Sequence, residues 1–213
     1  MANKYEKLAS STTATQKELW TVAQKNEECA NLVARNPAAH DEVLRKVYEL
    51  LKEDNQEAAA ASIFRNKNAP KLLIEEILVE TDSPLIERDV DYPGKTSIAV
   101  LLASNPNTPA AWVEQLATSK FYMVREQVAA RMDLNSSMMV SLATDPVRHV
   151  REVLASNPTI SPEAASILAQ DHELSVRFKL ATNAKVHQQV LSRLAESNDA
   201  VLRLAAMTAP AYI

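Results

Sequence analysis

The chain has 213 residues, which is enough for one large domain or two small ones. It contains a single glycine, Gly94, and this excludes most phosphate-binding loops, because they need several glycines for the backbone to approach the ligand. The same scarcity argues against a β-sandwich or barrel, whose tight turns recur every 8–12 residues or so. The single cysteine, Cys29, excludes a disulfide framework and a thiolate-ligated zinc or iron–sulfur site.

The charges give no sign of a nucleic-acid surface. The formal net charge is −4; residues 1–97 carry 13 basic and 17 acidic side chains, and residues 98–213 carry 10 of each. Proteins that bind phosphates usually show a basic excess. No apolar stretch approaches the ~20 residues of a membrane span, and residues 1–14 lack the apolar run of a signal peptide. We therefore expect a cytoplasmic protein with a flexible N-terminus over residues 1–14.

The next segment, residues 15–80, holds irregular copies of one pattern. Two copies end at Asn36 and Asn66, which are 30 residues apart, and the next equivalent asparagine, Asn105, follows after 39. The excess length falls within residues 81–97, so we expect an inserted loop there, which either binds a partner or is a passive insertion.

From residue 98 to 213 the pattern repeats regularly, with a period of 26. A Leu-Ala pair recurs with this period, at residues 116–117, 142–143, 168–169 and 194–195. An arginine also recurs every 26 residues, at Arg125, Arg151, Arg177 and Arg203. Self-similarity over four copies indicates a structural repeat.

Each copy begins with a short amphipathic helix. In one copy Ser161 suits the N-cap and Pro162 the first helical position, and apolar residues follow at helical spacing. Thr108 and Pro109 are expected to open the preceding regular copy in the same way.

A second helix of about two turns follows in each copy. Val150, Val153 and Leu154 lie on one face of it, and Pro158 disfavours helical geometry at Asn157. Part of such a short helix is expected to be 3₁₀. One helix pair cannot bury its own apolar stripe, but stacked pairs can. We therefore predict an all-α, right-handed α-α superhelix, a solenoid of about seven two-helix repeats of 24–30 residues that forms one continuous domain.

This pattern resembles a known repeat family. Val150-Arg151 followed by Leu154-Ala155-Ser156-Asn157-Pro158, with Leu142-Ala143-Thr144-Asp145 before it, resembles the leucine-rich repeat variant family and is similar to HEAT repeats more broadly. The resemblance is good over about residues 97–210 and weaker over 19–80. It implies a superhelix of alternating short helices. Some members carry a cysteine cluster for iron and sulfur, which this chain lacks, so no cofactor is expected.

The repeats also place charged residues in register. Asp145 precedes Arg151 by six residues and Asp171 precedes Arg177 by six, whereas serines stand at this position before the other two arginines. HEAT-type repeats use such acid–arginine pairs as a hydrogen-bonded ladder between adjacent units, and an arginine fork suits this role. The alternative is a row of arginines that reads phosphates. The ladder candidates are Asp145, Arg151, Asp171, Arg177, Arg125 and Arg203.

No residue pattern points to catalysis or metal binding. The four histidines share no helical metal-binding spacing, and one glycine cannot build a nucleophile elbow. The repeated asparagines at 36, 105, 157 and 183 suit hydrogen bonding within turns. We expect no metal site and no enzyme activity.

Two departures from the repeat suggest a binding surface. Lys120-Phe121-Tyr122-Met123 replaces a polar turn, and methionines and tryptophan lie nearby, residue types that are favoured at interfaces. The alternative is that they fill the core. The candidate partner-binding residues are Trp112, Phe121, Tyr122, Met123, Arg148, His149 and Tyr92.

The sequence thus favours a non-enzymatic protein–protein interaction scaffold. One alternative is a HEAT-like nucleic-acid-binding protein or DNA glycosylase; a second is an immunity protein that inhibits a toxin. The C-terminal end carries no polar capping helix, so we also expect a homodimer through this end.

Overall fold

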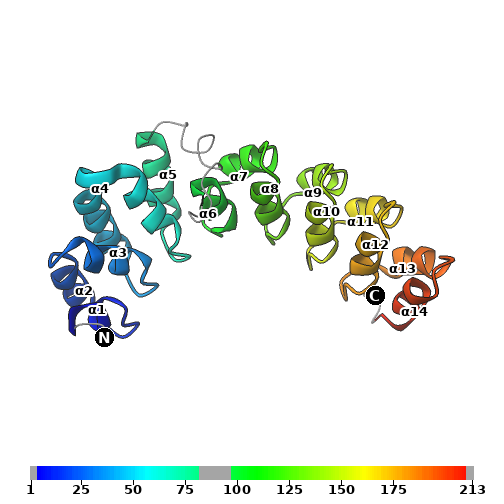
Figure 1. Ribbon diagram of the computed structural model, residues 1–213, viewed down its shortest axis with the longest axis horizontal. Coiled ribbons are helices and arrows are strands. Elements are labelled where there is room, and N and C mark those ends of the chain that lie inside the picture. The colour runs from blue at the N-terminus through cyan, green and yellow to red at the C-terminus, as the bar shows by residue number, and fades with distance from the viewer. Residues whose placement is uncertain (1–3, 82–96, 210–213) are drawn as a thin grey trace. The chain divides into compact units, whose positions relative to one another are not determined.

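The computed structural model describes residues 4–81 and 97–209, which form helices joined by turns and short irregular segments, with no strand among them (Figure 1). The expected all-α class is confirmed. The insertion expected at residues 81–97 lies almost entirely outside the described residues, as does Tyr92. The helices are α1 (Lys4–Ala9), α2 (Gln16–Ala23), α3 (Glu27–Arg35), α4 (Asp41–Phe64), α5 (Lys71–Glu80), α6 (Ile98–Ser104), α7 (Ala110–Ala117), α8 (Tyr122–Ala129), α9 (Ser136–Ala143), α10 (Arg148–Ala155), α11 (Pro162–Leu168), α12 (Leu174–Ala181), α13 (Gln188–Ala195) and α14 (Ala200–Thr208).

The chain divides into two compact units, Met1–Val113 and Glu114–Ile213, and the division falls within α7. We call them unit 1 and unit 2. Within the described residues, no helix is both long and apolar enough to cross a membrane.

Unit 2 contains two rows of helices. The helices α8, α10, α12 and α14, which we call the second-helix row, contact one another in that order, and α9 contacts α11 in the other row (Figure 1). On the inner face of the second-helix row, buried apolar residues recur every 26 residues. Val124, Val150, Val176 and Leu202 stand at one position of successive helices and are fully buried. Each such side chain contributes roughly 1.5–3 kcal/mol by leaving water.

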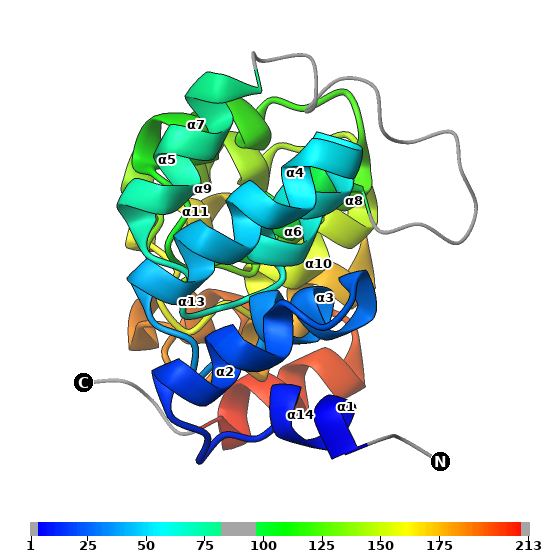
Figure 2. The same ribbon diagram turned by 90° about the vertical axis from the view of Figure 1, so that its left-hand side faces the viewer.

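Unit 1 departs from this regularity at α4, which lies against α3 (Figure 2). The backbone of Asn55, at φ −157° and ψ 100°, is extended and divides α4 into two helical parts. The Asn55 side-chain oxygen accepts a hydrogen bond from the backbone N–H of Ala58 at 2.9 Å, so this residue caps the second part. The second part carries the buried Ile63 and Phe64.

Of the two helix starts expected from the sequence, the structure shows one. Ser161 accepts a hydrogen bond from Ala164 N–H at 3.2 Å and Pro162 is the first residue of α11. Thr108 behaves differently, because its hydroxyl donates to the carbonyl of Leu102 at 2.7 Å instead of capping α7. The two-turn length of α10 is confirmed, but the expectation of 3₁₀ structure is wrong: none of the described residues forms a 3₁₀-helix. Two turns are already long enough for i→i−4 bonds, and i→i−3 bonds remain at the helix ends.

Buried asparagines join consecutive repeats in both units. In unit 1 the side-chain amide of Asn66 donates to the carbonyls of Ala34 and Asn36 at 3.0 and 2.9 Å. In unit 2 the amide of Asn183 donates to the carbonyls of Ala155 and Asn157 at 2.9 and 2.8 Å. Asn36, Asn105 and Asn157 make the corresponding pair of bonds. These amides satisfy carbonyls at helix ends that would otherwise be buried without a donor.

Candidate functional site

The outer surface of the second-helix row exposes large apolar side chains at its first helix. Tyr122 and Met123, at the start of α8, are 45% and 41% exposed. Phe121, just before them, is only half-buried, and the Lys120 ammonium lies 4.9 Å from the centre of its ring. Trp112, in the part of α7 that belongs to unit 1, is half-buried.

Further apolar side chains lie exposed on the last two helices of the row. Leu174 and Phe178 lie one turn apart on α12, and Val201 and Leu204 lie on α14. Leu174 stands 52 residues after Tyr122, two repeat periods, and therefore occupies the same helix position. We call Tyr122, Met123, Leu174, Phe178, Val201 and Leu204 the second-helix face.

Sequence reasoning selected the first two of these residues and missed the other four. The signal was present in the 26-residue register, because Leu174 and Val201 occupy in later repeats the helix positions of Tyr122 and Met123.

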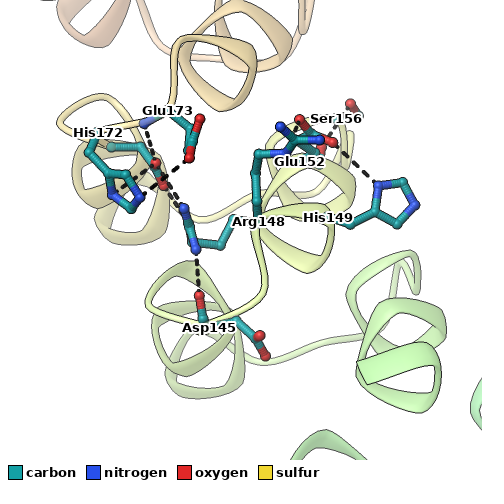
Figure 3. A network of polar contacts seen from close by, with 9 residues as sticks. Asp145, Arg148, His149, Glu152, Ser156, His172 and Glu173 are labelled. Carbon is teal, nitrogen blue, oxygen red and sulfur yellow. Dashed lines mark hydrogen bonds and ion pairs between the residues drawn. The ribbon is translucent and has the colours of Figure 1, made fainter. Parts of the chain in front are cut away.

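Between the apolar residues of α8 and α12, the surface of α10 is charged (Figure 3). Glu152 lies 3.3 Å from Arg148 Nε and 3.3 Å from His149 Nδ1, and the other ring nitrogen of His149 lies 3.5 Å from Glu126 on α8. The pKa of Glu152 lies below its ordinary value, first because the hydroxyl of Ser175 is beside it and then because His149 and Arg148 are, while burial opposes the shift. Arg148 and His149 are exposed, whereas Glu152 and Glu126 are more deeply buried, so this surface presents the Arg148 guanidinium and the His149 imidazole outward.

The predicted charge ladder lies beside the turns that precede the second helices. Arg125 donates from Nε and Nη2 to the two carboxylate oxygens of Asp145 at 2.6 and 3.0 Å. Arg151 holds Asp171 in the same way at 2.6 and 3.1 Å. Both pairs join neighbouring repeats and are nearly or fully buried.

Within a repeat, the aspartate and the arginine six residues after it do not form an ion pair. Arg151 donates from Nη1 to the backbone carbonyl of Asp145 at 2.7 Å, not to its carboxylate. The carboxylate partner comes 20 residues later, from the next repeat. Each arginine therefore joins its own turn to the following one.

The buried carboxylate of Asp171 is held ionised by its neighbours. Burial by itself raises its pKa, but the hydrogen bonds from Arg151 and from the backbone N–H of Glu173 outweigh this, so the pKa lies below its ordinary value. The pKa of Arg151 is raised by the same pairing. Asp145, Arg151 and Asp171 line a surface hollow of about 460 Å³, and their polar groups are already engaged with one another.

Among the described residues, no three histidine, cysteine, aspartate or glutamate side chains are grouped as metal ligands. Comparison with known proteins adds no relative: no family model matches the chain, and no curated protein does. The family resemblance therefore remains a prediction.

Proposed function

We propose that this chain is a non-enzymatic interaction scaffold, an α-solenoid of the leucine-rich repeat variant or HEAT type, which binds another protein through the second-helix face. One observation carries the proposal: six large apolar side chains are exposed at register positions of helices in the second-helix row. Exposed apolar residues that occur in groups usually mark an interaction site, whereas scattered ones do not.

The composition of the face supports a protein partner. Tyrosine, phenylalanine and methionine are enriched at protein interfaces, and a few aromatic anchors usually contribute most of the binding energy. Tyr122 and Phe178 are the aromatic anchors of this face. The cation Arg148 lies between them along the row, next to the imidazole of His149, and would select a partner with acidic residues.

The nucleic-acid alternative has no comparable support. Its arginine row would have to reach phosphates, but the guanidinium groups of Arg125 and Arg151 are occupied by carboxylates. The immunity-protein alternative differs only in the identity of the partner and remains open within the same proposal.

Affinity capture from the native lysate tests the proposal when it is done with matched variants. The face variant carries Tyr122→Ala, Phe178→Ala and Leu204→Ala. The control carries Leu72→Ala and Val79→Ala, which remove apolar side chains from α5 in unit 1 that are at least as exposed as those of the face variant. We expect a protein that the wild type and the control retain and that the face variant loses at least tenfold, with unchanged circular dichroism. Equal retention by all three proteins would refute the assignment of this face.

A homodimer through α14 remains a prediction as well. Leu204 and Met207 are 63% and 73% exposed on this helix. Light scattering over a concentration series tests it: a dimer that Met207→Lys dissociates supports self-association through α14, and a monomer at every concentration contradicts it.

A further inference from the structure

The four arginines of the ladder share one backbone contact, but they do not all pair with a carboxylate. Each arginine donates from Nη1 to the backbone carbonyl of the residue six positions earlier; the acceptors are Ser119, Asp145, Asp171 and Ser197. The turns are also alike. The side-chain oxygens of Asp171 and Ser197 accept a hydrogen bond from the backbone N–H two residues later, at 2.9 and 3.2 Å. Position 197 therefore points its side chain as position 171 does.

At Arg177 the carboxylate is missing. By the spacing of 20 residues that pairs Arg151 with Asp171, the partner position of Arg177 is Ser197. Within residues 4–81 and 97–209, no carboxylate oxygen lies within 4.0 Å of the Arg177 guanidinium, and its Nε and Nη2 make no hydrogen bond. These are the two donors that hold the carboxylate at Arg125 and Arg151.

The surroundings orient the free donors of Arg177 toward an incoming anion. The Arg177 guanidinium is held in place by its bond to the Asp171 carbonyl, so its fork is already oriented. Arg177 and Ser197 are both half-buried, and charge-assisted bidentate bonds are stronger in such a setting than in open solvent. The side chain at position 197 ends in a hydroxyl, whereas that of Asp171 ends in a carboxylate, so the chain itself supplies no carboxylate at the partner position of Arg177.

We propose that Arg177 and Ser197 form a binding site for a carboxylate supplied from outside the chain, held by the Nε and Nη2 donors of Arg177. The carboxylate comes either from an aspartate or glutamate side chain of a partner protein or from a small free carboxylate. The site lies on the ladder and not on the second-helix face, so it stands independently of the proposed function.

Nuclear magnetic resonance of the ¹⁵N-labelled full chain tests the site directly. The Nε–H signals of Arg125, Arg151 and Arg177 are followed while sodium acetate replaces sodium chloride at constant ionic strength. A second titration uses the peptide N-acetyl-Ala-Asp-Ala-amide. We expect a saturable shift of the Arg177 signal only, because the other two forks are occupied. Tighter binding of the peptide indicates a side-chain carboxylate, and tighter binding of acetate indicates a free one.

Two variants at position 197 complete the test. In Ser197→Asp the chain supplies its own carboxylate, so the Arg177 signal should move toward that of Arg151 and the apparent Kd for both ligands should weaken at least tenfold. Ser197→Ala is the matched control and should keep the response, since the proposed donors belong to Arg177. If the wild-type Arg177 signal shows no saturable shift with either ligand, or if the shift persists in Ser197→Asp, the site does not exist.

Discussion

At the scale of single residues, one side chain decides whether an arginine of the ladder is paired with a carboxylate. Asp145 and Asp171 pair with arginines, and the single change to serine at position 197 leaves Arg177 without a carboxylate. Burying an ion pair carries a desolvation cost that offsets much of the attraction, so a rung adds little net stability over apolar packing. Removing one partner is costly, however, because it leaves a buried charge uncompensated.

We therefore expect Asp171→Ala to lower the free energy of unfolding by about 3–5 kcal/mol. Glu49→Ala is a suitable comparison, because Glu49 forms an exposed ion pair with Lys52 at 2.7 Å and such pairs contribute about 0–1 kcal/mol. Chemical denaturation measures both. Equal losses in the two variants would show that burial does not govern the ladder.

The pH dependence of stability gives a second prediction about the same carboxylate. The pKa of Asp171 is lower in the folded protein than its ordinary value, so the folded state favours the ionised form. Its stabilising contribution is present above the unfolded pKa of about 3.9 and is lost as the pH falls through the folded pKa. In Asp171→Asn the free energy of unfolding should therefore fall less steeply below about pH 5 than in the wild type. Parallel curves would contradict this assignment.

At the scale of elements, the side chain of Asn55 determines where α4 is interrupted. The backbone breaks at Asn55, whose side chain caps the segment that follows. The break creates a second helix that ends near Asn66, as in the regular repeats. One asparagine thus converts a long helix into the two-helix pattern of the repeat.

Asn55→Ala should lower the free energy of unfolding by about 1 kcal/mol, the usual value of a lost N-cap. Asn55→Ser keeps an acceptor for Ala58 N–H and should lose only a few tenths of a kcal/mol. Thermal unfolding of both variants measures the difference. If alanine were as stable as serine at this position, the cap would not explain the break.

The local part of the architecture could be predicted from the sequence, whereas the pairing of residues between repeats could not. The cap at Ser161 and the two-turn length of α10 follow from neighbouring residues. The pairing of Arg151 with Asp171 depends on how the next repeat docks, which local spacing does not reveal. Local sequence also predicts Thr108 as an N-cap, but its hydroxyl donates to the carbonyl of Leu102 in the preceding helix. Four of the six residues of the second-helix face, those on α12 and α14, could not be recognised until the helices are aligned by the 26-residue period.

At the scale of the whole molecule, stability should vary along each unit. Within unit 2, α10 is contacted by helices on both sides of its row, whereas α14 is contacted by α12 and α13. Backbone groups with fewer packed neighbours open at lower free energy.

Amide hydrogen exchange should therefore be faster in α14 than in α10 by about tenfold or more, a difference of roughly 1.4 kcal/mol in local opening. The helices have nearly equal lengths, nine and eight residues, which makes them a fair comparison. Mass spectrometry of peptic fragments measures both in one experiment. Uniform protection would mean that unit 2 opens only as a whole.

The asparagine amides have a consequence for how such a chain can grow. Asn66 and Asn105 are 39 residues apart, yet Asn105 reaches the carbonyls of Phe64 and Asn66 at 2.9 and 3.0 Å, as Asn183 reaches its own pair across 26 residues. The amide anchors each turn to the previous one whatever length of chain runs between them. Genetic insertions between two anchors can therefore add a new loop to one repeat while its neighbours keep their register.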